Sequence, residues 1–325
     1  MKAWEIRDGH LDLHEVAPPR PSRQAITAIS VRHSGICGSD LPKLRHPSRF
    51  TLPAPWRPGH EIVGTDPTGR TVAIDPLVPC QTCPRCAAGD SHLCPDLQRL
   101  GWDLPGGFAE EVRVPTDNAH PLPTRLDPLH AVLADPTAVA AHGLRCAPIR
   151  PPGRLAVVGA GTIGLLTALY ARWQGWEVTV FHREGRAPSP AVAKAIPADC
   201  RLPLTTDEKA FDVVVDAASG AEATPLALAL GVVRDGGSIV VQNAYDPDVA
   251  LPVPLRSLFR RSIRLIGSFS HCRRQSGDFH LGLTLLNQHA DSVAPLIAEV
   301  GHLTDLRALL EHEVAPGRRR TLTLL

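Results

Sequence analysis

Short strand-like segments dominate the first half of the chain, and frequent proline and glycine residues separate them. Apolar or alternating apolar and polar side chains occur at residues 25–31, 61–64, 71–74 and 108–114. Short strands with closely spaced turn signals are typical of a compact β-rich domain, which we predict for this half.

The pattern changes after the proline-rich turn at residues 151–154. An apolar run at 155–158 leads into a glycine-rich turn, and residues 163–174 then carry apolar side chains at helical spacing. A second helix is predicted at 221–233. Further buried strands are predicted at 177–181, 211–216, 238–242 and 263–267. Because strands alternate with helices, we predict a parallel sheet covered on both faces.

From about residue 278 the pattern is helical again, and the chain closes on a predicted strand at 321–325. A chain of 325 residues exceeds what one hydrophobic core usually organises. We therefore expect about two domains.

The composition and net charge of the chain indicate which kinds of binding partner to expect. The 34 Lys and Arg residues nearly cancel the 33 Asp and Glu residues, so we expect neither a nucleic-acid nor a membrane partner. The N-terminal segment lacks the apolar core of a signal peptide, and no run approaches the roughly 18 apolar residues of a membrane span. These features predict a cytoplasmic protein, in which clustered cysteines bind metal more often than they form disulfides.

Residues 159–164 read Gly-Ala-Gly-Thr-Ile-Gly, between a predicted strand and a predicted helix. In this context G-x-G-x-x-G is typical of a dinucleotide site, because the first glycine permits the turn, the second lets the backbone approach a pyrophosphate, and the third permits close helix packing. The alternative is a glycine-rich turn that binds no ligand. The residues assigned to cofactor binding here are Gly159, Gly161, Thr162, Ile163 and Gly164.

The end of the next strand bears on the choice of coenzyme. NAD-binding units place an acidic residue there, about 20 residues after the glycines, whereas this chain has Phe181-His182-Arg183. Arg183, with His182, can pair with the 2′-phosphate of NADP, so we predict that NADP(H) is favoured over NAD(H). The alternative is that Arg183 is a solvated loop residue and NAD binds without the usual acid.

Four of the eight cysteines lie within residues 79–95, the four-cysteine lobe. Their spacing is Cys80-x2-Cys83-x2-Cys86-x7-Cys94. Four thiolates complete the tetrahedral shell of a structural zinc and leave no position for substrate. If this site is saturated, the chemistry lies elsewhere in the chain.

A second set of ligand types occurs in two short motifs, Gly-Ile-Cys-Gly-Ser-Asp at 35–40 and Pro-Gly-His-Glu at 58–61. Cys37 and His60 are predicted to form part of a catalytic zinc shell that keeps an open position. Asp40 is predicted to orient His60 through its other ring nitrogen. Taken singly, Cys37 is more often a core thiol and His60 a hydrogen-bonded histidine, so the prediction rests on their occurring together.

Taken in order, these motifs resemble those of the zinc-dependent medium-chain alcohol dehydrogenases, and the resemblance spans nearly the whole chain. Residues 75–80 and 135–142 are most similar to the polyol and sugar-alcohol branch, which includes sorbitol, threonine and galactitol-phosphate dehydrogenases. The motifs that carry the likeness are 35–40, 58–61, 80–94, 106–110 (Gly-Gly-Phe-Ala-Glu) and 159–164.

The resemblance implies an α/β chain with two domains. A GroES-like, β-rich catalytic domain is expected at residues 1–146 and 275–325, and a doubly wound Rossmann nucleotide-binding domain at 147–274. The chain is somewhat shorter than members of this family. Because residues 184–210 are proline-rich with weak periodicity, we expect a strand and a helix of the nucleotide domain to be trimmed there.

The same resemblance assigns roles in catalysis. Cys37, His60 and Glu61 are implied to ligate the catalytic zinc, with Asp135 as a further ligand. Whether Glu61, Asp135 or both bind is left open. Ser39 is implied to relay a proton between the reacting oxygen and the cofactor ribose.

Further residues are assigned to proton exit and to the cofactor. Pro42 stands where many alcohol dehydrogenases have the next histidine of the relay, so we expect the proton to leave through His46 or water. Arg320, in the terminal strand, is implied to contact the pyrophosphate, although three consecutive arginines are usually a solvated stretch. Ala217 and Asn243 complete the predicted cofactor site.

Together these inferences predict an enzyme that interconverts a secondary alcohol, of polyol, cyclitol or sugar-alcohol type, and its ketone by hydride transfer to or from NAD(P). Two zinc ions per chain, one catalytic and one structural, and a homodimer or homotetramer are expected. One alternative is a zinc-independent quinone or enoyl reductase of the same superfamily, against which the ligand set of Cys37 and residues 58–61 argues. Another is a non-catalytic zinc protein that senses dinucleotide or binds nucleic acid, which the near-zero net charge disfavours.

Overall fold

The computed structural model describes residues 1–18, 26–196, 198–202, 209–219, 222–245, 253–274, 277–312, 314 and 318–324, and the chain divides into two compact units. Unit 1 comprises Met1–Asp135, Cys272–Val314 and Arg319–Leu325, and unit 2 comprises Pro136–His271 and Ala315–Arg318. The division falls near the start of helix α3 (Ala134–Cys146), whereas the predicted domain boundary lies at the end of that helix.

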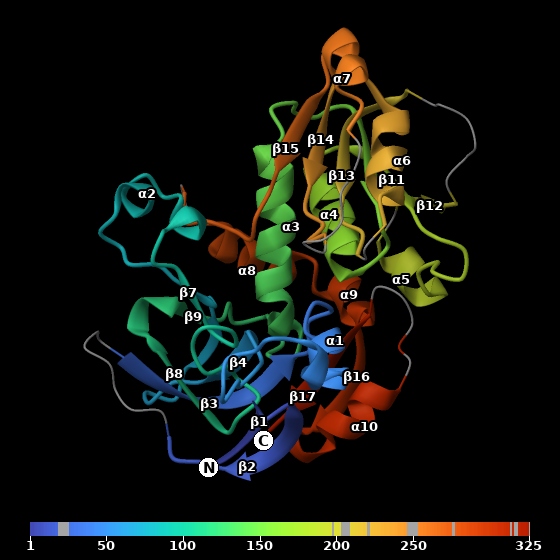
Figure 1. Ribbon diagram of the computed structural model, residues 1–325. Coiled ribbons are helices and arrows are strands. Elements are labelled where there is room, and N and C mark those ends of the chain that lie inside the picture. The colour runs from blue at the N-terminus through green and yellow to red at the C-terminus, as the bar shows by residue number, and fades with distance from the viewer. Residues whose placement is uncertain are drawn as a thin grey trace. The chain divides into compact units, whose positions relative to one another are not determined.

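Unit 1 is built around a seven-stranded sheet (Figure 1). The strands of this unit are β1 (Lys2–Arg7), β2 (His10–Glu15), β3 (Ile26–Gly35), β4 (Glu61–Thr65), β5 (Thr71–Ile74), β6 (Leu77–Val78), β7 (Gln98–Arg99), β8 (Glu111–Pro115), β9 (Ala119–Pro121), β16 (Ile297–His302) and β17 (Arg319–Thr323). The main sheet has the order β16-β17-β3-β4-β5-β9, and β8 pairs with β3 outside this path. The remaining pairs, β1 with β2 and β6 with β7, form two small antiparallel sheets.

The core of unit 1 contains large aromatic side chains among aliphatic ones. Trp4, Trp56 and Phe108 are all buried in one cluster. The indole of Trp4 donates to the carbonyl of Leu303 at 2.6 Å, and the indole of Trp56 donates to the carbonyl of Gly101 at 2.8 Å. Each buried N–H therefore has an acceptor, which removes the cost of placing indoles in an apolar core.

The C-terminal strand is inserted between β16 and β3. β17 pairs with β16 in parallel and with β3 antiparallel, where Thr321 faces Gly35 and Thr323 faces His33. β3 in turn pairs antiparallel with β4, where Gly35 faces Glu61. The end of β3, the start of β4 and the start of β17 therefore lie side by side, although they are far apart in the sequence.

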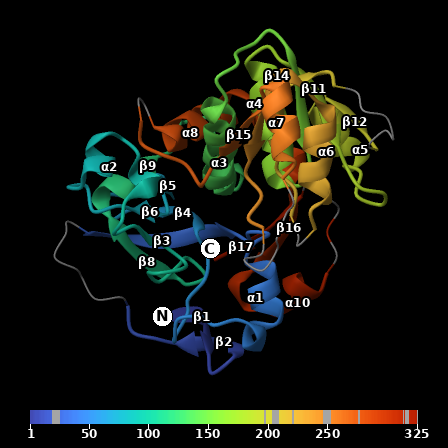
Figure 2. The same cartoon turned by 45° about the horizontal axis from the view of Figure 1, so that its top comes forward.

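Short helices complete unit 1. They are α1 (Leu41–Arg45), α2 (Pro84–Ala87), α8 (Asp278–Gln288), α9 (Ala290–Val293) and α10 (Leu306–Glu311). Helix α1 lies beside α10 (Figure 2). Among the described residues of the whole chain, no helix combines the length and hydropathy that crossing a bilayer requires.

Unit 2 contains a six-stranded parallel sheet. Its strands are β10 (Arg154–Val158), β11 (Glu177–Phe181), β12 (Asp199–Arg201), β13 (Phe211–Asp216), β14 (Val233–Val241) and β15 (Arg264–Gly267). They lie in the order β12-β11-β10-β13-β14-β15. Counted along the chain this is 3-2-1-4-5-6, the doubly wound order of dinucleotide-binding folds, whose direction reverses between β10 and β13. The predicted α/β class is confirmed.

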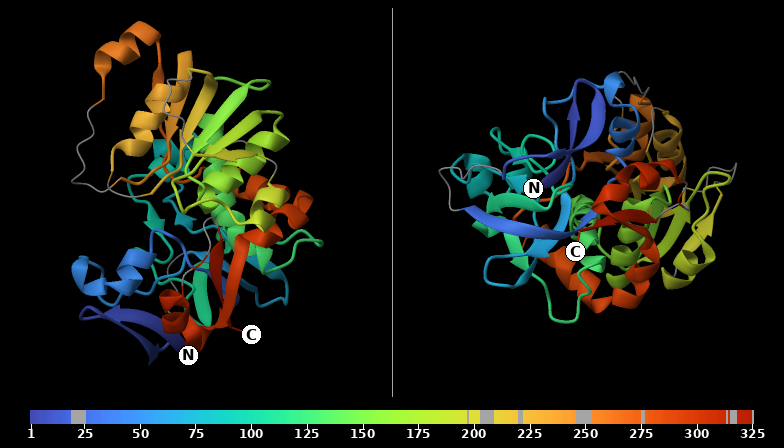
Figure 3. Two further views of the ribbon diagram at one scale, coloured as in Figure 1. Left: turned by 90° about the vertical axis from the view of Figure 1, so that its right-hand side faces the viewer. Right: turned by 90° about the horizontal axis from the view of Figure 1, so that it is seen from below.

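Helices cover both faces of this sheet (Figure 3). Besides α3, they are α4 (Thr162–Trp173), α5 (Pro190–Ala195), α6 (Thr224–Val232) and α7 (Leu255–Arg261). Helix α4 packs on β10 and β11, and α6 packs on β13 and β14. Right-handed crossovers on either side of the reversal place these two helices on opposite faces, and the reversal opens the carboxyl edge of the sheet to a ligand.

Residues 184–210 were expected to carry a trimmed strand and helix. The segment contains both elements in short form, α5 with six residues and β12 with three. Pro190 begins α5, and the hydroxyl of Ser189 accepts a hydrogen bond from the N–H of Val192. The proline that weakens the helical periodicity therefore also starts the helix.

Candidate functional site

The glycine-rich turn joins β10 to α4 in unit 2, and Thr162 is the first residue of that helix. Gly159 has a φ of +109°, and a Cβ there would lie 2.9 Å from the carbonyl oxygen of Ala217. A Cβ on Gly164 would collide with the carbonyl oxygen of Gly159, whereas a Cβ on Gly161 would meet no atom within 4 Å. The chain itself therefore requires the first and third glycines, while the second leaves open space at the helix N-terminus.

Alanine at two of these glycines is expected to separate ligand binding from stability. Gly161→Ala adds a methyl group where the protein leaves room, so the free energy of unfolding stays within about 0.5 kcal/mol while dinucleotide affinity falls at least about tenfold. Gly164→Ala forces strand and helix apart and is expected to lower the free energy of unfolding by about 1–3 kcal/mol. Thermal unfolding and coenzyme titration measure the two quantities. Equal destabilisation by both variants would contradict this division.

The carboxyl ends of β13 and β14 gather polar side chains beside the turn. Ala217 donates its N–H to the carbonyl of Val158 at 3.0 Å, which brings the end of β13 next to the glycines. Asn243 is only 9% exposed, and its side chain interacts with the Asp216 carboxylate and the Tyr245 hydroxyl. The hydroxyl of Tyr245 donates to the carboxylate of Asp216 at 2.6 Å, and burial raises the pKa of that carboxyl. This edge therefore places an amide, a carboxylate and a phenol beside the glycine-rich turn, groups that can hydrogen-bond a polar ligand.

The predicted coenzyme-selective residues lie at the end of β11. Arg183 is exposed, and Nδ1 of His182 donates to the carbonyl of Arg183 at 3.0 Å. The N–H of His182 donates to the carbonyl of Arg201 at 3.1 Å, which places a second arginine at this end of the sheet. The sequence analysis did not select Arg201, because its strand was not predicted.

The second ligand set is assembled by β3 and β4 in unit 1. Cys37 lies two residues after the end of β3, His60 precedes β4, and Glu61 is the first residue of β4. Each offers one ligand atom, and all three atoms lie within 4.8 Å of one another. Antiparallel pairing of Gly35 with Glu61 explains why two motifs far apart in the sequence meet. A thiol, an imidazole and a carboxylate at this separation fit a zinc shell with a vacant position.

Glu61 is deeply buried and faces a buried arginine. Its carboxylate lies 3.1 Å from Arg319, and a Cβ on Gly35 would collide with it, so glycine is required there. Burial raises the pKa of Glu61, although the charge of Arg319 opposes this, and the charge of Asp135 adds to the rise. Asp135 therefore lies close enough to act electrostatically, but it is not one of the three residues grouped within 4.8 Å.

The accessible side of this set is formed by Cys37 and Ser39. The Cys37 thiol and the Ser39 hydroxyl lie 3.3 Å apart, and Ser39 is exposed. Behind them, Nδ1 of His60 lies 3.2 Å from the carboxylate of Asp40, which is 0% exposed. Burial lowers the pKa of His60, but Asp40 and Cys37 outweigh this, so its pKa is raised. Because Asp40 faces Nδ1, Nε2 remains for a metal ion.

The structure brings Arg319, which the sequence analysis did not select, to the ligand set. Besides its ion pair with Glu61, Arg319 donates to the carbonyl of Ile36 at 3.1 Å. Arg320, which was predicted to contact the cofactor pyrophosphate, donates to the carbonyl of His312. His46, the predicted proton exit, is exposed at the end of α1. The roles of Arg320 and His46 therefore stay predictions.

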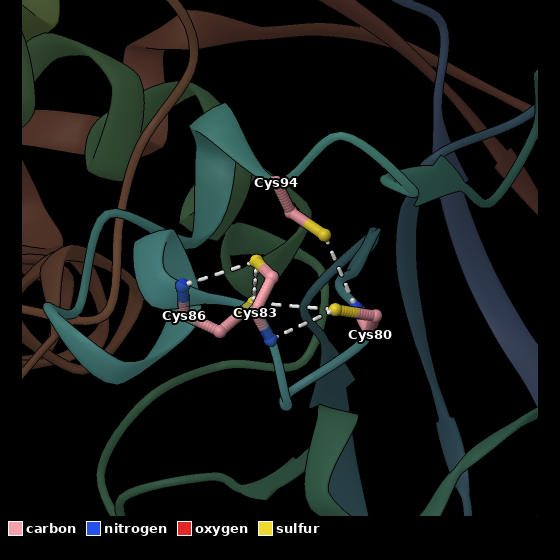
Figure 4. A group of neighbouring side chains, drawn as sticks. All are labelled: Cys80, Cys83, Cys86 and Cys94. Carbon is pink, nitrogen blue, oxygen red and sulfur yellow. Dashed lines mark hydrogen bonds between the residues drawn. The ribbon is translucent and has the colours of Figure 1, made fainter.

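The four cysteines of the lobe point toward one another (Figure 4). Their sulfur atoms all lie within 4.8 Å of one another, with Cys80 to Cys86 at 3.9 Å and Cys83 to Cys86 at 3.5 Å. A tetrahedron with zinc–sulfur bonds of about 2.3 Å has edges of roughly 3.8 Å. The observed spacing fits that shell without rearrangement of the chain.

The electrostatics of the lobe also fit a cation. Hydrogen bonds from Thr82 and from the backbone lower the pKa of Cys80 to about 6, whereas burial raises the pKa of Cys86 to about 12. Backbone N–H groups of Cys80, Cys83 and Cys86 donate to neighbouring sulfur atoms at 3.3 to 3.5 Å. The chain therefore supports thiolate charge, and a metal ion would supply the positive charge that the remaining thiols need to ionise.

Comparison with known proteins gives relatives along nearly the whole chain. Residues 24–124 match the model of the alcohol dehydrogenase GroES-like domain. The D-altritol 5-dehydrogenase of Agrobacterium fabrum is 34% identical over 74% of this chain and 76% of its own length, and the 2-dehydro-3-deoxy-L-galactonate 5-dehydrogenase of Pseudoalteromonas atlantica is 27% identical over 94% and 90%. A Sinorhizobium meliloti protein described as a zinc-binding dehydrogenase, solved with NADP bound, superposes with a TM-score of 0.86 at 25% identity over 99% of this chain and 98% of its own.

Proposed function

This chain belongs to the zinc-dependent medium-chain alcohol dehydrogenase superfamily, in its polyol and sugar-alcohol branch, and from that premise we propose that it interconverts a secondary alcohol and its ketone by hydride transfer to or from NAD(P). The observation that carries the proposal is the grouping of Cys37, His60 and Glu61 within 4.8 Å, with Cys37 open to the exterior. The named relatives are dehydrogenases of a polyol, D-altritol, and of a sugar acid, 2-dehydro-3-deoxy-L-galactonate, which supports a polyol-type substrate.

Cys37, His60 and Glu61 are the proposed ligands of the catalytic zinc, and Asp135 is the candidate for a further one. When bound, zinc supplies a Lewis acid that acidifies the hydroxyl of the substrate. The guanidinium of Arg319 lies 3.1 Å from the Glu61 carboxylate. Its positive charge reduces the net negative charge of the ligand set, and the ion pair holds the carboxylate in place. Asp40 holds the His60 ring in one orientation through Nδ1.

Ser39 is the proposed first acceptor of the substrate proton. Its exposed hydroxyl lies 3.3 Å from the Cys37 sulfur, so a hydroxyl bound at the ligand set comes within hydrogen-bonding reach of it. The proton then leaves by way of water or His46, because Pro42 carries no titratable group. Gly161 and the N-terminus of α4 are the proposed site of the pyrophosphate, and Asn243 of the nicotinamide half.

A second, structural zinc is proposed for Cys80, Cys83, Cys86 and Cys94. The sulfur spacing within the lobe supports four thiolate ligands, which leave no position for substrate. Two zinc ions per chain are therefore expected by elemental analysis. None or one would favour the zinc-independent reductase instead.

NADP(H) is the proposed coenzyme. Arg183 and Arg201 lie at the carboxyl ends of adjacent strands, and neither end carries the acidic residue that an NAD-specific site uses for the ribose. A guanidinium pairs with a 2′-phosphate by charge-assisted hydrogen bonds.

A panel of alditols, cyclitols and sugar phosphates, assayed in parallel with NAD and NADP, tests substrate and coenzyme together. We expect turnover of at least one secondary polyol, with kcat/KM for NADP at least about tenfold above that for NAD, since such a pair is worth roughly 1.5–3 kcal/mol. A strong preference for NAD would refute the role of Arg183. Absence of turnover by zinc-replete protein across the panel would refute the proposed activity.

A homodimer or homotetramer in the cytoplasm is proposed as the working form. All eight cysteines are free thiols, as a reducing compartment favours. β15 is the last strand of its sheet, and the apolar side chains Phe259, Phe269 and Leu265 on and near it are 84%, 52% and 39% exposed. An open strand edge with exposed apolar side chains favours pairing with a second copy. A monomer in sedimentation equilibrium at micromolar concentration would refute this.

A further inference from the structure

A tyrosine that the sequence analysis did not select lies at the carboxyl edge of the sheet in unit 2. Tyr245 follows β14 by four residues, and its hydroxyl reaches the neighbouring strand, where it donates to the carboxylate of Asp216 at 2.6 Å. Asp216 is the last residue of β13 and is fully buried. Its carboxylate also accepts the N–H of Ala218 at 3.2 Å. The tyrosine is therefore tied to the end of β13, although it follows β14 in the sequence.

The chemistry of the two groups keeps this hydrogen bond formed. Burial raises the pKa of the Asp216 carboxyl, and hydrogen bonds from Tyr245, Ala218 and Asn243 oppose that rise, so they favour the ionised form. Burial and the neighbouring carboxylate raise the pKa of Tyr245, so its hydroxyl stays protonated and remains a donor. A hydrogen bond to an ionised acceptor is stronger than a neutral one. The Tyr245 ring also packs against the apolar core of unit 2, which fixes the direction from which the hydroxyl approaches.

Asp216 holds both ends of the short segment that follows β14. The N–H of Gln242 donates to the Asp216 carbonyl at 2.9 Å, and Nε2 of Gln242 donates to the carbonyl of Val139 on α3 at 2.7 Å. Tyr245 closes the other end of the segment through its hydroxyl. The buried Asn243 lies between these two anchors. Its backbone and side chain therefore have little freedom while both anchors hold.

This segment lies beside the proposed coenzyme site. In the pairing of β10 with β13, Asp216 faces Val158, the residue before Gly159 of the glycine-rich turn. The two strand ends approach so closely that a Cβ on Gly159 would lie 2.9 Å from the carbonyl oxygen of Ala217. The direction of the sheet reverses between these strands, and ligands of such sheets bind at the carboxyl ends there. Asp216 therefore connects the segment that carries Asn243 to the edge where the dinucleotide is proposed to bind.

We propose that Tyr245 is a positioning residue for the coenzyme, because its hydrogen bond to Asp216 fixes the segment that carries Asn243 before the coenzyme binds. The proposal rests on the proposed function, since it takes this edge as the site of NAD(P). A segment that is already ordered loses less conformational entropy when a ligand binds. Without the hydrogen bond, coenzyme binding must order the segment and is therefore weaker. Hydride transfer in the fully bound enzyme is nearly unchanged, because the bound coenzyme restores that order.

Tyr245→Phe tests the proposal, since it keeps the ring and removes only the hydroxyl. We expect the dissociation constants of NADP and NAD, measured by calorimetric titration, to rise by about 5- to 15-fold, which is what ordering one or two loosened side chains costs on binding. Both constants should rise by the same factor, because the 2′-phosphate is proposed to bind elsewhere, at Arg183. At saturating coenzyme, kcat should stay within about threefold of the unmodified value. A purely structural role would instead lower the midpoint of thermal unfolding and leave both dissociation constants unchanged.

Asp216→Asn is the conservative variant. Its Oδ1 can still accept the N–H of Ala218, and its Nδ2 can donate to the Tyr245 oxygen, so both dissociation constants should stay within about threefold of the unmodified values. The double variant Tyr245→Phe/Asp216→Asn should bind no more weakly than Tyr245→Phe alone, since both changes act on one hydrogen bond. If Asp216→Asn binds coenzyme as weakly as Tyr245→Phe, the effect belongs to the carboxylate charge and the role of the hydrogen bond is overturned.

Tyr170→Phe is the matched control, because Tyr170 is the other tyrosine of the chain. It lies eight residues after Thr162, the first residue of α4, and so about 12 Å along the helix from the glycine-rich turn. Its dissociation constants should equal those of the unmodified protein. Unchanged constants in Tyr245→Phe, or an equal rise in Tyr170→Phe, overturn the positioning role while the proposed function stands. If the unmodified, zinc-replete protein binds neither coenzyme in the titration, the proposed function itself fails.

Discussion

Cys37→Ser is expected to lower kcat/KM by about 1,000-fold or more, equal to about 4 kcal/mol of transition-state stabilisation. A serine hydroxyl is a poor zinc ligand, whereas a thiolate is a strong one. The substitution leaves His60 and Glu61 without their third partner in the group. Because the Cys37 side chain is only half-buried, the free energy of unfolding should change by less than about 1 kcal/mol. Initial rates, zinc content and thermal unfolding of one preparation measure all three effects.

Cys200→Ser is the control for this variant, since Cys200 lies on β12 and belongs to no group of side chains placed to bind a metal ion. Its zinc content and kcat/KM should match those of the unmodified protein. Loss of one zinc ion per chain in Cys37→Ser and none in Cys200→Ser is the expected pattern. Full turnover by Cys37→Ser would remove Cys37 from the proposed catalytic set.

The parts of the site that could be predicted from sequence are those set by local structure. The glycine-rich turn is one, because Gly159 needs a positive φ and Gly164 needs the space of a missing Cβ, and both needs arise within a few residues. The cysteine lobe is another, since its spacing alone brings the sulfur atoms together. Cys37 and His60 were selected through the motifs that surround them, and strand pairing, which the sequence does not display, brings them together.

That Arg319 faces the ligand set could not be predicted, because the register of β17 against β3 decides which arginine points there. Successive side chains of a strand point to opposite faces, so only one of Arg319 and Arg320 can face Glu61. The pairing of Thr321 with Gly35 fixes that choice in favour of Arg319. Nothing in a run of three arginines indicates this register, and the family resemblance assigned Arg320 to the cofactor pyrophosphate and no arginine to the ligand set.

Contacts made by loops and short helices were missed for a related reason. Helix α1 has five residues, too few for a periodicity that would indicate which side chains share a face. The ammonium of Lys43, on this helix, lies 5.5 Å from the centroid of the Phe50 ring and 4.6 Å from that of Trp102. Both rings come from other segments, because Phe50 follows the helix and Trp102 lies beyond the cysteine lobe. Such a cluster arises from tertiary packing, and only the coordinates of the folded chain reveal it.

Loss of the metal site in the four-cysteine lobe should lower the stability of the protein much more than its catalytic rate. Cys83→Ser is expected to bind one zinc ion per chain in place of two and to lower the free energy of unfolding by about 3–5 kcal/mol, because a structural metal contributes its binding energy to folding. Cys83 is the N-cap of α2, where its sulfur accepts the N–H of Cys86. A serine hydroxyl can accept the same N–H, so the expected loss of stability comes from the ion. The midpoint of thermal unfolding should fall by roughly 10 °C or more.

The surroundings of the lobe predict how far the disruption spreads. Arg274 pairs with Asp90 at 2.5 Å, and Arg273 donates its N–H to the carbonyl of Gly89 at 3.2 Å, so the lobe anchors the segment that begins the C-terminal part of unit 1. Arg274→Ala, which leaves all four thiols in place, should keep two zinc ions per chain. Because Arg274 is exposed but Asp90 is buried, losing this ion pair should lower the free energy of unfolding by about 1–3 kcal/mol. At a temperature where Cys83→Ser is still folded, its kcat/KM should stay within about threefold of the unmodified value, because four thiolates give substrate no access to their metal. A Cys83→Ser protein that is fully stable yet inactive would reverse the two assignments and make the lobe the site of chemistry.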